Sequence, residues 1–267
     1  MKNIAFSKLC ASGNDFIVID NREKILHDNI KDIAIKLCKR KYSIGADGLM
    51  LVEKSDKADF KMRIINPDGS EVDMCGNGAR CIALYAYKNK IALNKMTFET
   101  FAGLIEAEVT KDNLVKLKMS APHSLSLDKE WNFINTGVPH VVIFVDDIDK
   151  IDVKTIGNSI RYHKKFAPAG TNVNFVKIKD DKHIRVRTYE RGVEDETLAC
   201  GTGSVASAII SGIKFGMKSP VSVITQGGSA LNIYFKIDKN KSVSDVCLEG
   251  DAEIIYEGSL HKLSIKN

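Results

Sequence analysis

The chain has 267 residues, of which 44% are hydrophobic and 27% are charged, and its formal net charge is +5. This composition is typical of an ordinary globular protein with one large domain or two smaller ones. The positive excess is spread along the chain without a basic block, which argues against a nucleic-acid partner.

The sequence shows no targeting or membrane-spanning segment. Its N-terminal apolar stretch is too short for a signal peptide, and no apolar run approaches the length of a membrane span. We therefore expect a cytoplasmic protein with no membrane partner. The six cysteines match neither a disulfide framework nor paired zinc motifs, so no metal is expected. Four of them should be buried as small hydrophobic residues: Cys10, Cys38, Cys81 and Cys247.

Helical and strand patterns mingle along the chain. Residues 28–41 have apolar side chains at helical spacing. Residues 60–64, 115–119 and 183–190 alternate between apolar and polar side chains, as half-buried strands do. The first of these strands runs into Asn-Pro-Asp-Gly at 66–69, a turn signal. The mixture predicts the α+β class.

One sequence occurs almost twice. VDMCGNGARCIA at residues 72–83 is echoed by TLACGTGSVASA at 197–208. In both places a strand and an acidic turn come first. A cysteine, a Gly-x-Gly and a helix of small and apolar residues then follow. We interpret this as an internal duplication. A helix that is apolar all round must be enclosed by protein, so we expect two similar domains, each a curved mixed sheet or barrel around its own central helix.

A cysteine at a helix N-terminus is suited to proton transfer. The helix dipole and nearby N–H groups favour the thiolate and lower the pKa of such a thiol by about one unit from about 8.5. If the two motifs meet in a cleft between the domains, Cys75 could remove a proton from an α-carbon while Cys200 delivers one from the opposite side, or the reverse. A stereocentre would be inverted without a cofactor.

The residues that follow each cysteine could hold the substrate. Backbone N–H groups of Gly76 and Asn77, and of Gly201 and Thr202, can bind a carboxylate at the start of a helix. Such binding would stabilise the negative charge that develops on the carbanion.

Other interpretations stay open. Both cysteines could be buried residues at helix starts beside structural glycines. A nucleophilic cysteine needs a histidine base, for which His140 is the candidate, but this leaves the second cysteine unexplained. A redox protein with a reversible Cys75–Cys200 disulfide explains both cysteines, although such pairs usually have C-x-x-C spacing.

Several motifs together resemble those of the diaminopimelate epimerase family along nearly the whole chain. They are SGNDF (12–16), GADGL (45–49), NPDGSEVDMCGNGARC (66–81), GVPH (137–140), TNVNF (171–175) and YERG followed by ETLACGTG (189–203). The resemblance implies an isomerase that interconverts LL- and meso-diaminopimelate in lysine and peptidoglycan precursor synthesis, with no cofactor. An alternative keeps the scaffold with a proline-like or other amino acid as substrate, or with a non-racemising isomerisation as the reaction.

The resemblance also implies roles for individual residues. Cys75 and Cys200 would be the acid/base pair, and His140 and Glu190 would tune the cysteines. The substrate-binding residues would be Asn14, Asn66, Gly76, Asn77, Asn172, Glu190, Arg191, Gly201 and Thr202. The chain departs from the family pattern at Val138, where many members have Asn, and at Gly48, where some have Gln.

The resemblance completes the expected organisation. Because the last strand of such proteins returns to the first domain, we predict an N-terminal domain of residues 1–119 plus 258–267 and a C-terminal domain of residues 120–257. The expected partner is a small molecule, and a homodimer is the candidate assembly.

Overall fold

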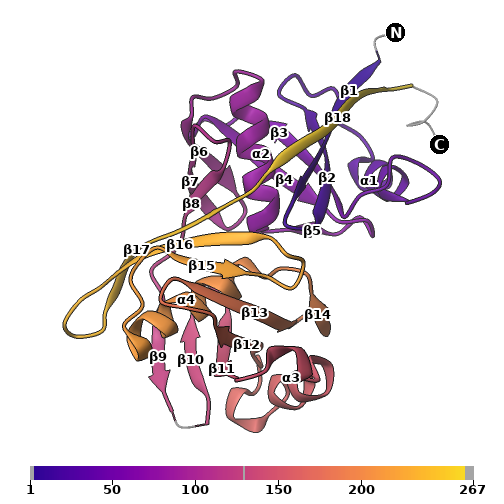
Figure 1. Cartoon of the computed structure of the whole chain (residues 1–267). Helices are drawn as coiled ribbons and strands as arrows, with labels where there is room; N and C mark the ends of the chain where they lie inside the picture. The colour runs from indigo at the N-terminus through magenta and orange to yellow at the C-terminus, as the bar shows by residue number, and fades with distance from the viewer. Residues whose placement is uncertain (1–2, 129, 262–267) are drawn as a thin grey trace. The chain divides into compact units, whose positions relative to one another are not determined.

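The computed structural model describes residues 3–128 and 130–261, which form two compact units of sheet and helix (Figure 1). The first unit holds the described residues up to Leu117 and those from Asp251 onwards, and the second runs from Lys118 to Gly250. The boundaries predicted from the sequence fall at 119/120 and 257/258. Both units combine mixed sheet with helices, which confirms the α+β class.

The first unit is a mixed sheet in the order β18-β1-β2-β3-β4-β6-β7-β8. The β2–β3 and β4–β6 pairs are parallel, the other neighbours are antiparallel, and the short β5 pairs with β4. The strands are β1 (Ile4–Ala11), β2 (Asn14–Asp20), β3 (Gly48–Glu53), β4 (Phe60–Ile65), β5 (Glu71–Val72), β6 (Lys95–Thr100), β7 (Gly103–Val109), β8 (Val115–Lys118) and β18 (Glu253–Leu260).

The second unit repeats this plan in the order β9-β10-β11-β12-β13-β15-β16-β17. Its parallel pairs, β11–β12 and β13–β15, correspond to β2–β3 and β4–β6, and β14 pairs with β13 as β5 does with β4. The predicted duplication is confirmed by this topology. The strands are β9 (His123–Leu127), β10 (Asn132–Asn135), β11 (Pro139–Phe144), β12 (Asn172–Ile178), β13 (His183–Glu190), β14 (Asp195–Thr197), β15 (Val221–Ile224), β16 (Ala230–Ile237) and β17 (Val243–Gly250).

Each sheet wraps around one helix. In the first unit, α2 (Gly76–Lys88) packs against β1, β2 and β7, and every residue from 77 to 86 is buried. In the second, α4 (Gly201–Phe215) packs against β11, β12 and β16, and residues 203–211 are buried. The prediction that both helices are enclosed by protein is confirmed.

Three serines on α4 are buried, and each has a hydrogen-bond partner within the helix. The hydroxyl groups of Ser204, Ser207 and Ser211 donate to the carbonyl oxygens four residues earlier, at 2.7–2.9 Å. A buried hydroxyl needs a partner, and this back-bonding supplies one in each case. Small side chains with internal partners therefore let the surrounding strands approach the helix closely.

The remaining helices cover the outside of the sheets. In the first unit, α1 (Ile30–Cys38) packs on β3, within the range 28–41 predicted to be helical. In the second, α3 (Val153–Arg161) packs on β12 and β13, flanked by the 3-10 turns η1 (Ile148–Lys150) and η2 (Lys164–Phe166). Within the described parts of the chain, every helix is too short or too polar to cross a membrane.

Four cysteines outside the paired motif were expected to be buried. Cys38 and Cys81 are buried, and burial raises the pKa of the Cys38 thiol to about 11 and that of Cys81 further still. The prediction is wrong for Cys10 and Cys247, which are half-buried. Cys10 is the next-to-last residue of β1, and Cys247 lies two residues after the exposed Asp245 on β17.

Candidate active site

Cys75 is the N-cap of α2. Its backbone is extended (φ −138°, ψ 122°), and the N–H of Gly78 donates to its sulfur at 3.5 Å. The glycine at 78 is required by packing, since a Cβ there would lie 3.1 Å from Met50 Sδ and 3.2 Å from Ile64 Cδ1. At Gly76 a Cβ would meet no atom within 4 Å. The half-buried thiol therefore sits at the positive end of the helix dipole, beside a backbone that is open at Gly76.

Asn14 and Asn77 contact each other at this turn. Nδ2 of Asn77 donates to Oδ1 of Asn14 at 2.5 Å, and Nδ2 of Asn14 donates to Asp47 Oδ2 at 3.1 Å. Oδ1 of Asn77 accepts from the guanidinium of Arg80 at 2.9 Å. The structure thus brings two of the predicted binding amides together at the start of α2, next to Cys75.

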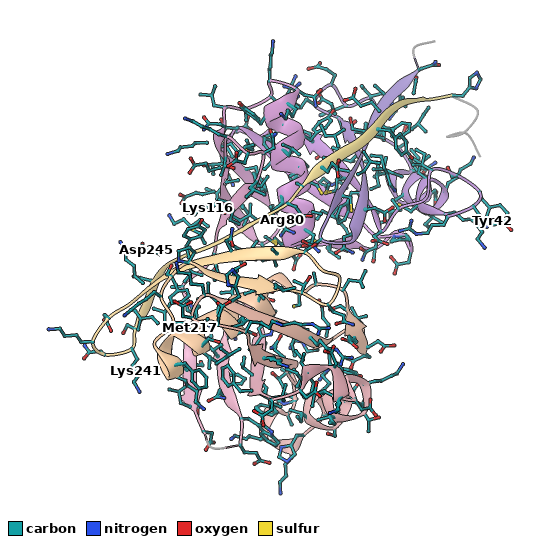
Figure 2. All side chains as sticks on the ribbon, viewed as in Figure 1. Tyr42, Arg80, Lys116, Met217, Lys241 and Asp245 are labelled. Atoms are coloured by element: carbon teal, nitrogen blue, oxygen red, sulfur yellow. The ribbon has the colours of Figure 1, made fainter. Side chains whose placement is uncertain are left out.

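Arg80 is a neighbour of Cys75 that sequence reasoning missed. Its side chain is fully buried on α2 (Figure 2), and burial lowers its pKa. Its N–H groups donate to neutral oxygens: Ser12 Oγ at 2.8 Å, the Asp251 carbonyl at 3.0 Å, and Asn77 Oδ1. The available signal was one arginine within a run of mostly small and apolar residues.

Asn66 lies in the predicted turn after β4. Its backbone N–H and its side-chain Nδ2 donate to the carbonyl and hydroxyl oxygens of Ser70 at 2.8 and 3.0 Å, and Gly69 has a positive φ of 82°. The Asn66 amide therefore bonds within its own turn. The amides of Asn14 and Asn77 instead bond to each other at the start of α2. A role of Asn66 in substrate binding stays a prediction.

Cys200 holds the N-cap position of α4, but its side chain makes no cap hydrogen bond of the kind that Cys75 accepts from Gly78. The thiol is buried, and its sulfur lies 3.6 Å from Thr202 Oγ1. The Glu190 carboxylate also accepts a hydrogen bond from Cys200 and another from Thr197 Oγ1 at 3.0 Å. Burial raises the pKa of Glu190, against the effect of these two hydrogen bonds.

His140, Asn174 and Thr188 form a buried row across three neighbouring strands. His140 on β11 is level with Asn172 on the parallel β12, and Asn174, two residues along, lies on the same face and opposite Thr188 on β13. Nδ2 of Asn174 contacts His140 Nδ1 at 3.1 Å, and Thr188 Oγ1 donates to Asn174 Oδ1 at 3.0 Å. His140 Nε2 contacts Thr202 Oγ1 at 2.9 Å, so the row reaches the first turn of α4.

The His140 ring is neutral. Burial, and then the nearby charge of Arg191, lowers its pKa to about 3. Both ring nitrogens already have partners, in Thr202 and Asn174. The ring therefore has no nitrogen left to act as a base toward Cys200, which removes the support for a hydrolase-like cysteine and histidine pair.

Asn172 and Arg191 are joined at the end of β13. Nδ2 of Asn172 donates to the Pro139 carbonyl at 2.9 Å, and its Oδ1 accepts from the Arg191 backbone N–H at 2.8 Å. The Arg191 guanidinium donates to the Ala169 carbonyl at 3.2 Å and remains partly exposed. Asn172 bonds Arg191, and the preceding residue, Glu190, accepts from Cys200. The second unit thus brings these three predicted residues together with the start of α4.

Gly48 is explained by packing. A Cβ there would lie 3.3 Å from the Ile65 carbonyl and 3.4 Å from the Phe16 ring, so a longer side chain needs these neighbours to move. Val138 is half-buried, and its carbonyl accepts from the Thr136 N–H at 3.2 Å. Nothing in the structure explains why valine in particular stands there.

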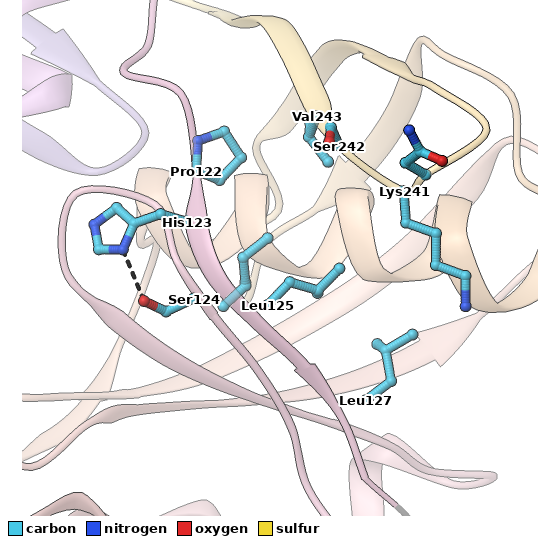
Figure 3. Close-up of a pocket in the computed structure, with 10 residues that line it drawn as sticks. Pro122, His123, Ser124, Leu125, Leu127, Lys241, Ser242 and Val243 are labelled. Atoms are coloured by element: carbon cyan, nitrogen blue, oxygen red, sulfur yellow. Dashed lines mark hydrogen bonds between the residues drawn. The ribbon is translucent and has the colours of Figure 1, made fainter.

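A separate pocket of about 520 Å³ opens on the second unit between β9 and the hairpin that joins β16 and β17 (Figure 3). It holds none of the predicted site residues, and neither a thiol nor a carboxylate lines it: the lining residues are Pro122, His123, Ser124, Leu125, Leu127, Ile134, Asn240, Lys241, Ser242 and Val243. Across residues 3–128 and 130–261, His, Cys, Asp and Glu side chains form no group of three or more that could hold a metal ion.

Two like units, each with a cysteine at the start of an enclosed helix, are the arrangement expected of an isomerase of the racemase and epimerase class. The family model "Diaminopimelate epimerase" matches residues 6–125 and 132–255. The chain belongs to the diaminopimelate epimerase family, which confirms the resemblance found in the sequence motifs.

Similar proteins support this membership. The chain is 45% identical to "Diaminopimelate epimerase" of Aquifex aeolicus, over 96% of this chain and 97% of that protein. It is 44% identical to the protein of the same name from Hydrogenobaculum sp., over 95% and 97% of the two chains. A solved phenazine biosynthesis protein of the PhzF family from Bacillus anthracis shares the fold, with a TM-score of 0.74 at 18% identity, covering 98% of this chain and all of that one.

Proposed function

We propose that this protein interconverts LL- and meso-diaminopimelate by a two-base reaction in which Cys75 and Cys200 are the acid/base pair. The observation that carries the proposal is the repeated arrangement of a cysteine, a glycine and an enclosed helix in two units of the same topology. Family membership along nearly the whole chain supports the choice of substrate.

The reaction moves one proton off the α-carbon and another onto it. One sulfur, as thiolate, takes the α-proton, and the electron pair of the C–H bond remains on the substrate as a carbanion. The other sulfur, as thiol, gives its proton to the opposite face and becomes the thiolate. The chemistry requires both sulfurs to reach the same α-carbon, and it requires no cofactor.

The groups around each cysteine suit a zwitterionic substrate. Backbone N–H groups at the starts of α2 and α4 bind the α-carboxylate, and these groups hold the charge of the carbanion as it develops. The Arg191 guanidinium suits a second carboxylate because of its planar pair of donors, and the Glu190 carboxylate suits an ammonium group. The amide oxygens of Asn14, Asn77 and Asn172 are further acceptors.

Two substitutions test the assignment of the cysteines. We expect Cys75→Ala and Cys200→Ala each to lower the rate of inversion of LL-diaminopimelate by at least about 10³-fold, because the loss of either acid/base group breaks the two-proton exchange. Cys10→Ala and Cys247→Ala are matched controls on the first and second units, and should keep the rate. Full activity of either Cys75→Ala or Cys200→Ala would contradict the proposal.

Substrate and redox state need their own assay. Offered separately, LL-diaminopimelate should be inverted and a panel of proline and hydroxyproline isomers should not; the opposite result would favour the alternative substrate on the same scaffold. The assay is run in excess reductant, because both sulfurs must be thiols or thiolates. We propose the cytoplasm, a reducing compartment, as the location for the same reason.

A further inference from the structure

The row of buried polar side chains behind Cys200 has a defined direction of proton donation. Oδ1 and Nδ2 of Asn174 can be told apart because Nδ2 lies 2.8 Å from the Val141 carbonyl, an oxygen that can only accept. The other amide atom, Oδ1, accepts a hydrogen bond from the Thr188 hydroxyl at 3.0 Å. The second N–H of Asn174 therefore points at His140 Nδ1, 3.1 Å away.

This contact determines which nitrogen of His140 carries the proton. Nδ1 accepts from Asn174, so a neutral ring must hold its proton on Nε2. Nε2 lies 2.9 Å from Thr202 Oγ1 and donates to it. His140 and Asn174 are both fully buried and Thr188 is 3% exposed, so water does not compete for these partners.

The Thr202 hydroxyl is then left to donate its own proton. Its oxygen already accepts from His140, and the Cys200 sulfur lies 3.6 Å away. The Thr202 backbone is held as well, because its carbonyl accepts from Thr136 Oγ1 at 2.9 Å. Gly203 makes room for the arrangement: a Cβ at this position would lie 2.3 Å from Asn174 Oδ1.

We propose that Asn174 and Thr188 are positioning residues for Cys200, which hold His140 in the Nε2-protonated form and so direct the Thr202 hydroxyl proton to the sulfur. A hydrogen bond to the charged form of a group favours that form, so this donor stabilises the Cys200 thiolate each time the sulfur has given up its proton. The catalytic consequence rests on the proposed function, but the protonation pattern does not.

The surrounding charges make such a donor useful. Glu190 contacts Cys200 and, when ionised, opposes a thiolate there, whereas Arg191 acts on His140. The row of side chains directs an uncharged donor, the Thr202 hydroxyl, to the sulfur, and it places no further positive charge beside His140. Apart from His140, no residue of the row is ionisable. The direction of hydrogen-bond donation along the row therefore stays the same over the pH range in which the enzyme works.

Nitrogen NMR of the wild-type protein tests the direct claim. In protein labelled with ¹⁵N-histidine, with the His140 signals assigned by their loss in His140→Gln, we expect Nε2 to carry the proton and Nδ1 to be unprotonated from pH 5 to pH 8. A proton on Nδ1, or a doubly protonated ring, would overturn the proposal. This readout needs neither substrate nor activity, so it is independent of the proposed function.

Near-isosteric variants test the consequence for the sulfur. Asn174→Asp replaces the donor by an acceptor, so the ring proton should move to Nδ1 and Nε2 should accept a hydrogen bond from the Thr202 hydroxyl. With that hydroxyl turned away from the sulfur, alkylation of Cys200 by iodoacetamide at pH 7 should slow about tenfold. Thr202→Val should do the same, whereas Thr202→Ser keeps a hydroxyl and should stay near wild type. Peptide mass spectrometry separates Cys200 from the other cysteines.

Ser204→Ala is the matched control, because it removes a hydroxyl of the same helical turn that bonds the Cys200 carbonyl and not the sulfur. Its alkylation rate should stay within about twofold of wild type. If Thr202→Val proves as reactive as Thr202→Ser, the Thr202 hydroxyl is not a donor to Cys200 and the proposal fails, even where Asn174→Asp does not fold.

Discussion

Cys75 and Cys200 hold equivalent places at the starts of their helices, yet their charged neighbours have opposite signs. Arg80 is buried on α2, and its guanidinium donates to neutral oxygens at the helix start. Glu190 accepts directly from Cys200. A cation favours a thiolate and a carboxylate favours a thiol, so the resting proton should lie on Cys200. In the proposed reaction the sulfurs exchange roles, so the titration seen in kinetics would belong to the pair.

Substitution of Arg80 tests the first half of this contrast. In the Cys200→Ala background, Arg80→Met should slow alkylation of Cys75 at pH 7 by about tenfold or more, because the buried cation is lost. Arg80→Lys keeps the charge and should recover much of the rate. The carboxylate of Asp251 is a further charge near this site.

Arg22→Met is the control for Arg80, since it removes a guanidinium of the same unit that is already paired with Asp20 at 2.7 Å. It should leave Cys75 reactivity unchanged. Equal alkylation rates in wild type, Arg80→Met and Arg22→Met would show that the thiolate of Cys75 does not depend on Arg80.

At the scale of elements, the glycines of the two cysteine motifs divide into two kinds. Gly78 and Gly203, the second glycine of each motif, are packed against other side chains of their own units. Of the two first glycines, Gly76 faces open space, whereas a Cβ at Gly201 would lie 3.2 Å from Leu248 Cδ1. From the sequence we expected the backbone N–H group of Gly76 to bind a carboxylate, and the open space at Gly76 leaves room for one. Gly78 and Gly203 have a packing role instead.

Alanine substitutions separate these roles. Gly203→Ala forces a Cβ into Asn174 Oδ1 and should lower the free energy of unfolding by about 1–3 kcal/mol. Gly76→Ala should leave stability within about 0.5 kcal/mol of wild type and impair substrate binding instead. Urea unfolding and KM for LL-diaminopimelate measure the two effects. If Gly76→Ala destabilises the protein as much as Gly203→Ala does, the division is wrong.

Regular elements could be predicted where one periodicity decides them. Alternation at Phe60, Met62 and Ile64 was enough to place a strand. The runs of mostly small and apolar residues after each cysteine were enough to place enclosed helices. The row of His140, Asn174 and Thr188 could not be predicted, because it depends on the register of three strands far apart in sequence. Arg80 was hidden for a similar reason, since its partners at 12 and 251 come from distant segments.

At the scale of the whole molecule, buried His140 makes stability depend on pH. Its pKa is about 3 in the folded chain and about 6.5 in an unfolded one. Between these values the unfolded chain binds a proton that the folded chain does not, so stability is complete above about pH 6.5 and falls as the pH drops toward 3. At pH 5 the loss from this residue is about 2 kcal/mol.

Urea unfolding at pH 7 and pH 5 measures this dependence. The loss of stability on acidification should be about 2 kcal/mol smaller in His140→Gln than in wild type, because the glutamine does not titrate. A His140→Gln protein with the same acid sensitivity as wild type would show that this histidine is already accessible to protons in the folded chain.

The duplicated fold matters to function only if both cysteines serve one α-carbon, and proton exchange tests that most directly. The reduced protein is given LL-diaminopimelate in deuterium oxide, and substrate and product are analysed early in the reaction. Two bases predict one deuterium at the inverted α-carbon of meso-diaminopimelate, while the remaining LL-diaminopimelate still carries protium. Deuterium that enters both isomers at equal rates would mean that one base works on both faces, and would contradict the account.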